Sequence, residues 1–175
     1  MKKLKNTETE KNLLIAFSGE SQARNKYTFF ASQAKKEGFV NISKIISEIA
    51  DNEKEHAKIW FNYLNDSTNT VSNIKNAVNG EHFEWSEMYK KFSIIAKKEG
   101  FEEIAKKFDQ IAEIEKNHEK KFLNLLSEIE NNKVFTCDNN VVWICSKCGH
   151  IHFGKSAPEI CPVCKHSKSY FKKDC

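Results

Sequence analysis

The sequence predicts an all-α four-helix bundle over residues 1–133, followed by a small β-rich module over residues 134–175. Helical periodicity in four long segments, one motif that occurs twice, and a change of composition near residue 134 support this prediction. Charged residues make up 30% of the 175 residues and hydrophobic residues 39%. This balance is typical of a soluble globular protein with a sizeable core.

Four helices are expected over residues 9–37, 40–64, 72–99 and 101–130, because apolar side chains recur there at helical spacing. Gly38 and Gly100 provide the stops of the first and third helices. A polar break over residues 65–70 separates the two helix pairs, and residues 131–133 end the bundle. We expect the connection between the second and third helices to be long, which leaves an exchange of helices between subunits open.

A Glu-x-x-His motif occurs twice, as Glu53 with His56 and as Glu115 with His118. The surroundings repeat with the same offset, since residues 34–39 return as residues 96–101. Upstream, Glu20 is echoed by Glu81, but one residue out of step. A Glu on one helix and a Glu-x-x-His on the next, in duplicate, is the ligand set of a two-metal carboxylate site in a four-helix bundle.

The candidate ligands fall at one level of the predicted bundle. Each lies a similar number of residues from its glycine turn, so at ~1.5 Å per residue the heights differ by only about 5 Å. Any single Glu is more often a solvated surface residue, but two copies in register make coincidence improbable. A pair of dications would also offset the cost of burying the carboxylates. The set comprises Glu20, Glu53, His56, Glu81, Glu84, Glu115 and His118.

Glu84 is surplus to the usual set of four Glu and two His. It forms a Glu-x-x-Glu pair with Glu81, one helical turn away. An extra carboxylate there could replace another ligand when the metal charge rises. The alternative is that Glu84 faces solvent.

The C-terminal module holds all six cysteines and both prolines. Two Cys-x-x-Cys pairs, Cys145 with Cys148 and Cys161 with Cys164, predict a tetrahedral four-sulfur site for zinc or a single iron. A module of this size needs such a metal or disulfides to be stable. Its small aromatic core is expected from Trp143, Phe153, Tyr170 and Phe171.

Cys137 and Cys175 have no Cys-x-x-Cys partner and are interpreted as free thiols, with a disulfide between them as the unsupported alternative. No signal peptide or membrane-spanning stretch is visible, so we expect a reducing cytoplasm. The net charge is +4, but Lys and Arg are spread among Glu along the helices rather than clustered. We therefore expect solvated helix faces and no nucleic-acid partner.

Residues 19–27 and 81–89 resemble the signature segments of rubrerythrins, and the likeness extends to the C-terminal module. The resemblance implies a ferritin-like diiron bundle followed by a rubredoxin-like domain. It implies that Glu53 and Glu115 bridge two non-haem irons, with oxo and carboxylate bridges. Glu20 would be terminal on one iron, and Glu81 and His118 on the other. The first iron would move between His56 when reduced and Glu84 when oxidised, with Tyr27 and Tyr89 hydrogen-bonding nearby or simply packing.

One position departs from the family pattern. Rubredoxin-like sites usually have Gly after the last Cys of each pair, and here Lys165 follows Cys164. If the backbone there needs a positive φ, Lys is strained by roughly 1 kcal/mol. His82 is not a ligand position in the pattern.

The resemblance implies a peroxidase that protects against oxidative stress. Hydrogen peroxide would be reduced to water at the diiron site, with electrons relayed through the four-cysteine iron. Electrons would come from reduced rubredoxin or from NAD(P)H through a separate reductase, because the chain has no Gly-rich dinucleotide motif. The resemblance also implies a head-to-tail homodimer or a higher homo-oligomer.

Two other functions stay open at this point. One is iron oxidation and storage, which gives no reason for the cysteine module. The other is a helical binding module with a structural zinc ribbon, against which the seven bundle ligands argue. Zinc could also replace iron at either site.

Overall fold

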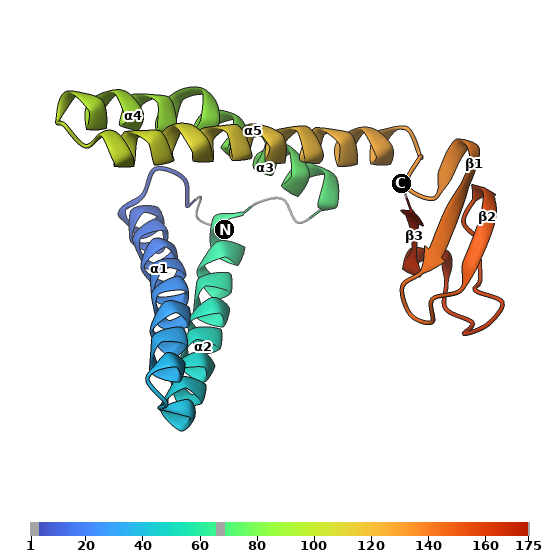
Figure 1. Ribbon diagram of the computed structural model, residues 1–175, viewed down its shortest axis with the longest axis horizontal. Coiled ribbons are helices and arrows are strands. Elements are labelled where there is room, and N and C mark those ends of the chain that lie inside the picture. The colour runs from blue at the N-terminus through green and yellow to red at the C-terminus, as the bar shows by residue number, and fades with distance from the viewer. Residues whose placement is uncertain (1–3, 66–68, 175) are drawn as a thin grey trace. The chain divides into compact units, whose positions relative to one another are not determined.

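The computed structural model describes residues 4–65 and 69–174, which form helices followed by a small antiparallel sheet (Figure 1). These residues belong to two compact units. One unit holds the first two helices, and the other holds the remaining helices and the sheet. Of the described helices, none combines the length and the apolar character needed to cross a membrane.

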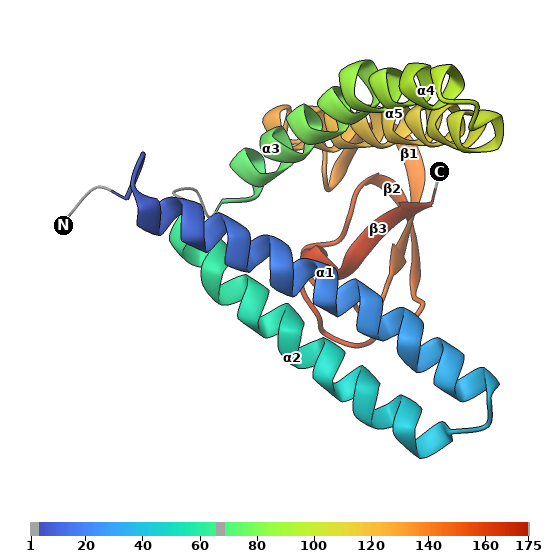
Figure 2. The same cartoon turned by 90° about the vertical axis from the view of Figure 1, so that its left-hand side faces the viewer.

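The first unit is a helical hairpin of α1 (Glu8–Lys36) and α2 (Val40–Leu64), which lie side by side (Figures 1 and 2). Its turn depends on Gly38, whose φ of 89° is open to glycine but strained for other residues. The amide N–H of Phe39 donates to the Ala34 carbonyl at 2.9 Å, and that of Gly38 to the Lys35 carbonyl at 3.2 Å. These two bonds are a Schellman cap, which ends α1 and reverses the chain at once.

The second hairpin pairs α5 (Glu102–Glu130) with a helix of three parts: α3 (Thr70–Phe83), a π-helical segment (Glu84–Met88) and α4 (Tyr89–Lys98). Gly100, with φ of 86°, repeats the turn at Gly38, and the N–H of Phe101 donates to the Ala96 carbonyl at 2.8 Å. The π-helical segment was not predicted. The expectation of a long second-to-third connection was wrong, because only five residues, 65–69, separate α2 from α3.

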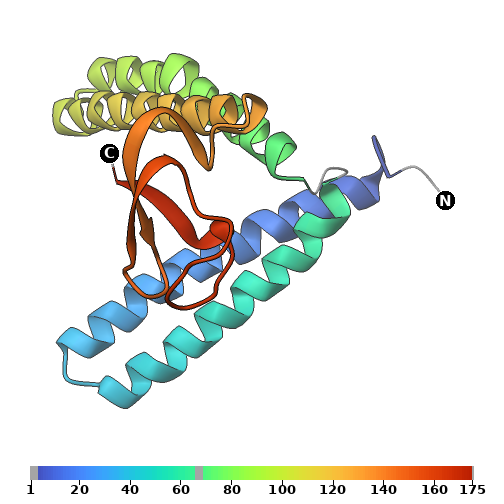
Figure 3. The same cartoon turned by 90° about the vertical axis from the view of Figure 1, so that its right-hand side faces the viewer.

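The C-terminal module is a three-stranded antiparallel sheet in the order β2-β1-β3 (Figure 3). Its strands are β1 (Thr136–Cys145), β2 (Ile151–Ser156) and β3 (Phe171–Asp174). Trp143 and Phe171 are buried in its core together with Cys145 and Cys161. The predicted core positions Phe153 and Tyr170 are wrong, since these side chains are 66% and 39% exposed.

Candidate metal centres

The first hairpin carries one half of the predicted carboxylate site. Nδ1 of His56 lies 2.8 Å from a Glu53 carboxylate oxygen, one turn back on α2, and 3.8 Å from a Glu20 oxygen on α1. The Glu53 side chain is 17% exposed, whereas the imidazole of His56 is 52% exposed. The three groups therefore meet on one face of the hairpin, where a cation could reach all of them.

The second hairpin carries the other half in the same arrangement. Nδ1 of His118 lies 2.6 Å from Glu115 on α5 and 3.8 Å from Glu81 on α3. The distance to the carboxylate on the neighbouring helix is thus the same in both hairpins. The sequence duplication is therefore also a duplication of ligand geometry.

Each half brings two carboxylates and one imidazole within 4.8 Å of one another. Oxygen and imidazole nitrogen donors suit iron, and the doubled set is that of the dimetal carboxylate bundles. Because the turns at Gly38 and Gly100 are alike, each hairpin places its helices in matching register. The donors present therefore fit a diiron site, for which the groups are Glu20, Glu53, His56 and Glu81, Glu115, His118.

Charge accumulates around Glu81. Burial raises the pKa of its carboxyl, and the nearby negative charges of Glu115 and Glu84 raise it further. Burial also raises the pKa of Tyr89, with contributions from the same three carboxylates. Anionic groups gathered in this way are relieved by a bound cation.

Glu84 lies outside the group formed by Glu81, Glu115 and His118. It is half-buried at the first residue of the π-helical segment, and its charge acts on both Glu81 and Tyr89. π-Helical turns are rare and are frequently found at functional sites. The prediction that Glu84 is a ligand stays a prediction, but this carboxylate faces the cluster closely enough to influence it.

The π-helical segment explains why the upstream repeat is out of step. Glu20 and Tyr27 are seven residues apart, whereas Glu81 and Tyr89 are eight apart. A π turn takes up one extra residue within an otherwise α-helical run, and the segment Glu84–Met88 lies inside this interval. The offset in the repeat is therefore the sequence signal that could have located the segment.

The second predicted tyrosine partner, Tyr27, is half-buried on α1 and stacks near Phe30, with ring centroids 6.1 Å apart. Tyr89 packs edge-on against Phe92 and at a tilt against Phe108. His82 points elsewhere: its Nδ1 lies 2.9 Å from Glu119, which also accepts a hydrogen bond from the indole of Trp85. His82 belongs to neither ligand group.

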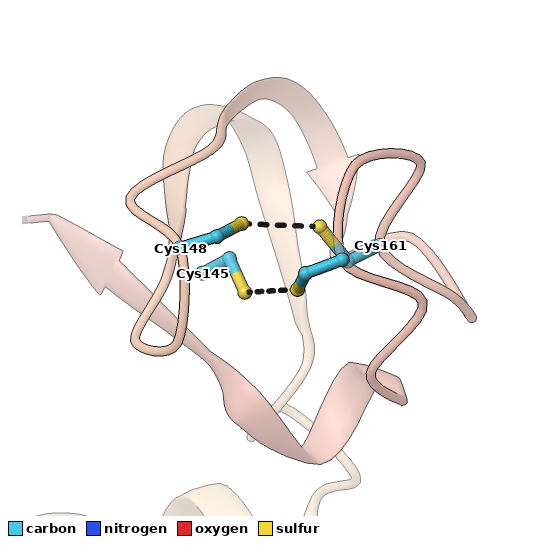
Figure 4. A group of neighbouring side chains, drawn as sticks. Cys145, Cys148 and Cys161 are labelled. Carbon is cyan, nitrogen blue, oxygen red and sulfur yellow. Dashed lines mark hydrogen bonds between the residues drawn. The ribbon is translucent and has the colours of Figure 1, made fainter.

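In the C-terminal module, four sulfur atoms converge from two loops (Figure 4). Sγ of Cys145 lies 3.6 Å from that of Cys164, and Sγ of Cys148 lies 3.6 Å from that of Cys161. Four thiolates around one metal at about 2.3 Å stand roughly 3.8 Å apart at the corners of a tetrahedron. The sulfurs are therefore already spaced for a single tetrahedral ion.

Backbone amides prepare two of these sulfurs for negative charge. Burial raises the pKa of the Cys161 thiol, but the N–H groups of Cys164 and Val163 outweigh it and bring the pKa to about 6. At Cys145 burial is likewise outweighed by the N–H groups of Cys148 and Lys147, and the pKa is lowered. At Cys148 the N–H of His150 lowers the pKa, but hydrogen bonds with the neighbouring sulfurs and burial outweigh it and raise the pKa to about 12. Because the thiolate is the form that binds metal, each loop therefore presents one thiol that ionises readily.

The two loops differ at one backbone position. Gly149 has φ of 76° and its N–H donates to the Cys145 carbonyl at 2.8 Å. Lys165 occupies the matching place with φ of 61°, and its N–H donates to the Cys161 carbonyl at 3.0 Å. The conditional prediction of a positive φ at Lys165 is therefore confirmed. The strain is tolerated because the loop geometry requires this turn.

Of the two remaining cysteines, Cys137 is half-buried and packs against the module's core. Its pairing with Cys175 lies outside the described residues. Cys137 is not a member of the four-sulfur group.

Comparison with known proteins accounts for both centres. A family model described as rubrerythrin matches residues 11–126. The chain belongs to the rubrerythrin family. A second model, described as the rubredoxin-like domain of rubrerythrin, matches residues 143–172. The predicted ferritin-like domain with a rubredoxin-like domain is thereby confirmed.

Two relatives match over nearly the whole chain. A rubrerythrin of Nitratidesulfovibrio vulgaris is 46% identical, covering 98% of this chain and 97% of the relative. Rubrerythrin-1 of Clostridium acetobutylicum is 45% identical, with the same coverage of 98% and 97%. A solved structure of nigerythrin in a mixed-valence state is 27% identical, covers 98% of this chain and 89% of that chain, and has a TM-score of 0.37. The alignment with the Nitratidesulfovibrio relative is 185 positions long, whereas this chain has 175 residues, of which 98% are aligned. More than ten positions of the alignment are therefore gaps in this chain.

The metal complement follows from the donors and the family together. Each carboxylate–histidine group is a candidate half of a diiron site, and the four cysteines fit a rubredoxin-like iron site. The family members are oxidoreductases, and the two kinds of candidate metal site in this chain agree with that class.

Proposed function

We propose that this protein is a peroxidase that reduces hydrogen peroxide to water at the diiron site and takes its electrons through the four-cysteine iron. One observation carries the proposal: a single chain contains two carboxylate–histidine groups and one four-sulfur group. The four-sulfur site handles one electron at a time, and peroxide reduction requires two electrons and two protons. A pair of irons bound by the carboxylate–histidine groups would supply the two electrons together.

The side chains of the site have different roles in this reaction. Glu20, Glu53 and His56 would hold one metal ion, and Glu81, Glu115 and His118 would hold the other. Glu84 would supply a further carboxylate beside Glu81, and this carboxylate would take the place of His56 as a ligand when the metal charge rises. The raised pKa of Tyr89 keeps its hydroxyl protonated, so that Oη serves as a hydrogen-bond donor next to these carboxylates.

The electron donor is reduced rubredoxin or an NAD(P)H-dependent reductase, and the working assembly is a head-to-tail homodimer or a larger homo-oligomer. A cytoplasmic location suits the four thiolates, since a reducing compartment keeps them available for metal. The boundary between the bundle and the rubredoxin-like domain is placed at residue 133.

The test is anaerobic stopped-flow mixing of the iron-loaded, fully reduced protein with hydrogen peroxide. The diiron absorbance should return first and the red colour of the four-cysteine iron second, at two electrons per peroxide. A double variant, Cys148→Ala with Cys164→Ala, is the matched control. It should reoxidise its diiron site once and then fail to turn over with an added donor. Peroxide left unconsumed by fully iron-loaded protein would overturn the proposal.

A further inference from the structure

The ligand-bearing face of each hairpin is exposed, which raises the question of which chain covers it. The ligands of α2 and α5 share their helix faces with apolar side chains at equivalent positions of the repeat. Ile42 and Ile49 precede Glu53 on α2, and Ile104 precedes Glu115 on α5. These side chains are 51%, 42% and 49% exposed. A dimetal bundle forms only when one hairpin lays this face against the other.

For the two hairpins of one chain to pack in this way, the connection between α2 and α3 needs a minimum length, which depends on the directions of the helices. Ferritin-like bundles contain one long crossover connection, in addition to short turns. The turns at Gly38 and Gly100 are both short, so the crossover has to be the connection between α2 and α3. A crossover makes α2 and α3 parallel. The connection must therefore run back along the bundle from the end of α2 to the start of α3.

The connection is too short for that path. Glu53 lies eleven residues before the end of α2, and Glu81 lies eleven after the start of α3. If both carboxylates stand at one level, the chain must climb ~33 Å at ~1.5 Å per helical residue. Residues 65–69 allow six Cα–Cα steps, which reach at most about 22 Å when fully extended.

Unwinding the start of α3 would lengthen the connection, but that end is capped. The side chain of Asn69 accepts the backbone N–H of Ser72 at 2.9 Å. An N-cap of this kind contributes about 1 kcal/mol, and opening it also gives up the helical hydrogen bonds of the first turn.

We propose that two copies of this chain exchange hairpins. Each diiron site then takes Glu20, Glu53 and His56 from one subunit and Glu81, Glu115 and His118 of the partner subunit. The five-residue connection simply crosses from one bundle to the other. This inference rests on the diiron site of the proposed function, but not on its peroxide chemistry.

Mixed dimers test the exchange by counting metal. One variant carries Glu53→Ala with His56→Ala, and a second carries Glu115→Ala with His118→Ala. Full-length chains with two different affinity tags are co-expressed, and the mixed dimer is isolated through both tags. After anaerobic loading with Fe²⁺, the iron bound beyond the four-cysteine site is measured. Exchange pairs the two intact hairpins, so half of the wild-type diiron sites should be recovered.

A second mixed dimer is the matched control and gives the opposite result. It pairs the wild-type chain with a chain that carries all four substitutions. Exchange then leaves each site with one broken hairpin and no diiron site, whereas a self-contained bundle leaves one site intact. Recovery in the second mixed dimer and not in the first would overturn the proposal, as would failure to isolate any dimer through both tags.

The connection itself provides a further control. Insertion of about 15 Gly and Ser residues between Asn65 and Asn69 lets one chain span its own bundle. With the insertion, the first mixed dimer should bind no iron at the diiron site, and the second should recover half of the wild-type diiron sites. Because the readout is bound iron, a protein with exchanged hairpins and no peroxidase activity would refute only the proposed function.

Discussion

At the scale of single residues, the backbone of Lys165 is strained. Its φ of 61° reproduces the turn made by Gly149 in the other loop, and the same hydrogen bond closes both turns. Glycine adopts this conformation freely, whereas an L-residue with a side chain does not. The comparison within one small module isolates the cost of the Cβ atom.

Lys165→Gly should therefore raise the free energy of unfolding of the metal-loaded module by about 1 kcal/mol. Denaturation with guanidinium, followed by loss of the iron–sulfur absorbance, measures the change. Lys165→Ala is the control, because it removes the 3.0 Å bond from Nζ to the Pro162 carbonyl but keeps the Cβ atom. An equal gain in both variants would show that backbone strain is not the cause.

Glu84→Gln tests the surplus carboxylate without changing its shape. Reoxidation of the reduced diiron site by hydrogen peroxide should slow by about tenfold or more, equivalent to ~1.4 kcal/mol in the barrier. Diiron content should stay at the wild-type level, because the other six ligands remain. Stopped-flow absorbance gives the rate, and Glu87→Gln, an exposed change in the same π-helical segment, should leave it unaltered. Equal rates in both variants would remove Glu84 from the reaction.

At the scale of elements, the π-helical segment sets the register between Glu81 and the rest of its helix. Each residue of an α-helix turns the chain by about 100°. The extra residue taken up by Glu84–Met88 therefore keeps Glu81 beside His118, although the repeat is out of step there. Without the π turn, the upstream carboxylate would face a different side of the hairpin.

Deletion of Ser86 should convert the segment to regular α-helix and rotate Glu81 away from Glu115 and His118. We expect iron binding at the diiron site to fall by at least about tenfold, while far-ultraviolet circular dichroism shows full helicity. Ser86→Ala is the control, since it removes a buried hydroxyl that has no hydrogen-bond partner and keeps the register. Normal iron content after the deletion would mean that the π turn does not position Glu81.

The sequence predicted the helices well because their determinants are local. Apolar periodicity placed α1, α2 and α5 to within a residue or two, and Gly38 and Gly100 located the turns. The π-helical segment was missed, because an i→i+5 turn uses the same residue types as an α-helix. Its trace was the one-residue offset between Glu20 and Glu81.

The ligands of the two kinds of metal site could be predicted from the sequence to different extents. Cys-x-x-Cys spacing defines a tetrahedral site almost alone, because each pair spans one tight loop. For the carboxylates, the motif identified Glu53 and His56 as neighbours, but Glu84 could not be assigned from spacing. The module's core was partly wrong, since exposure of Phe153 and Tyr170 depends on strand register and not on residue type.

At the scale of the whole molecule, the helical part and the module are stabilised differently. The helices are stabilised by their own backbone hydrogen bonds and by pairing within each hairpin, where the buried side chains are mainly alanines. In the module the buried core cluster has only five members, two of which are the ligands Cys145 and Cys161. A core of this size cannot offset the entropy of ordering the chain, so metal binding contributes directly to folding.

Removal of metal by a strong chelator should therefore unfold the module and leave the helices formed. Limited trypsin digestion should cut within residues 134–175 of the metal-free protein and spare the same sites in the loaded protein. Helical content, measured at 222 nm, should change little under the same conditions. Protection of the module in the absence of metal would contradict the assigned role of its four cysteines.

The short turns at Gly38 and Gly100 also affect the folding kinetics. In each hairpin one short turn joins two helices that contact each other, so a hairpin forms without first closing a long loop. Their union is a separate and later event. If the hairpins meet between two chains, refolding to the metal-binding state is second order, and its half-time shortens in proportion as the protein is concentrated.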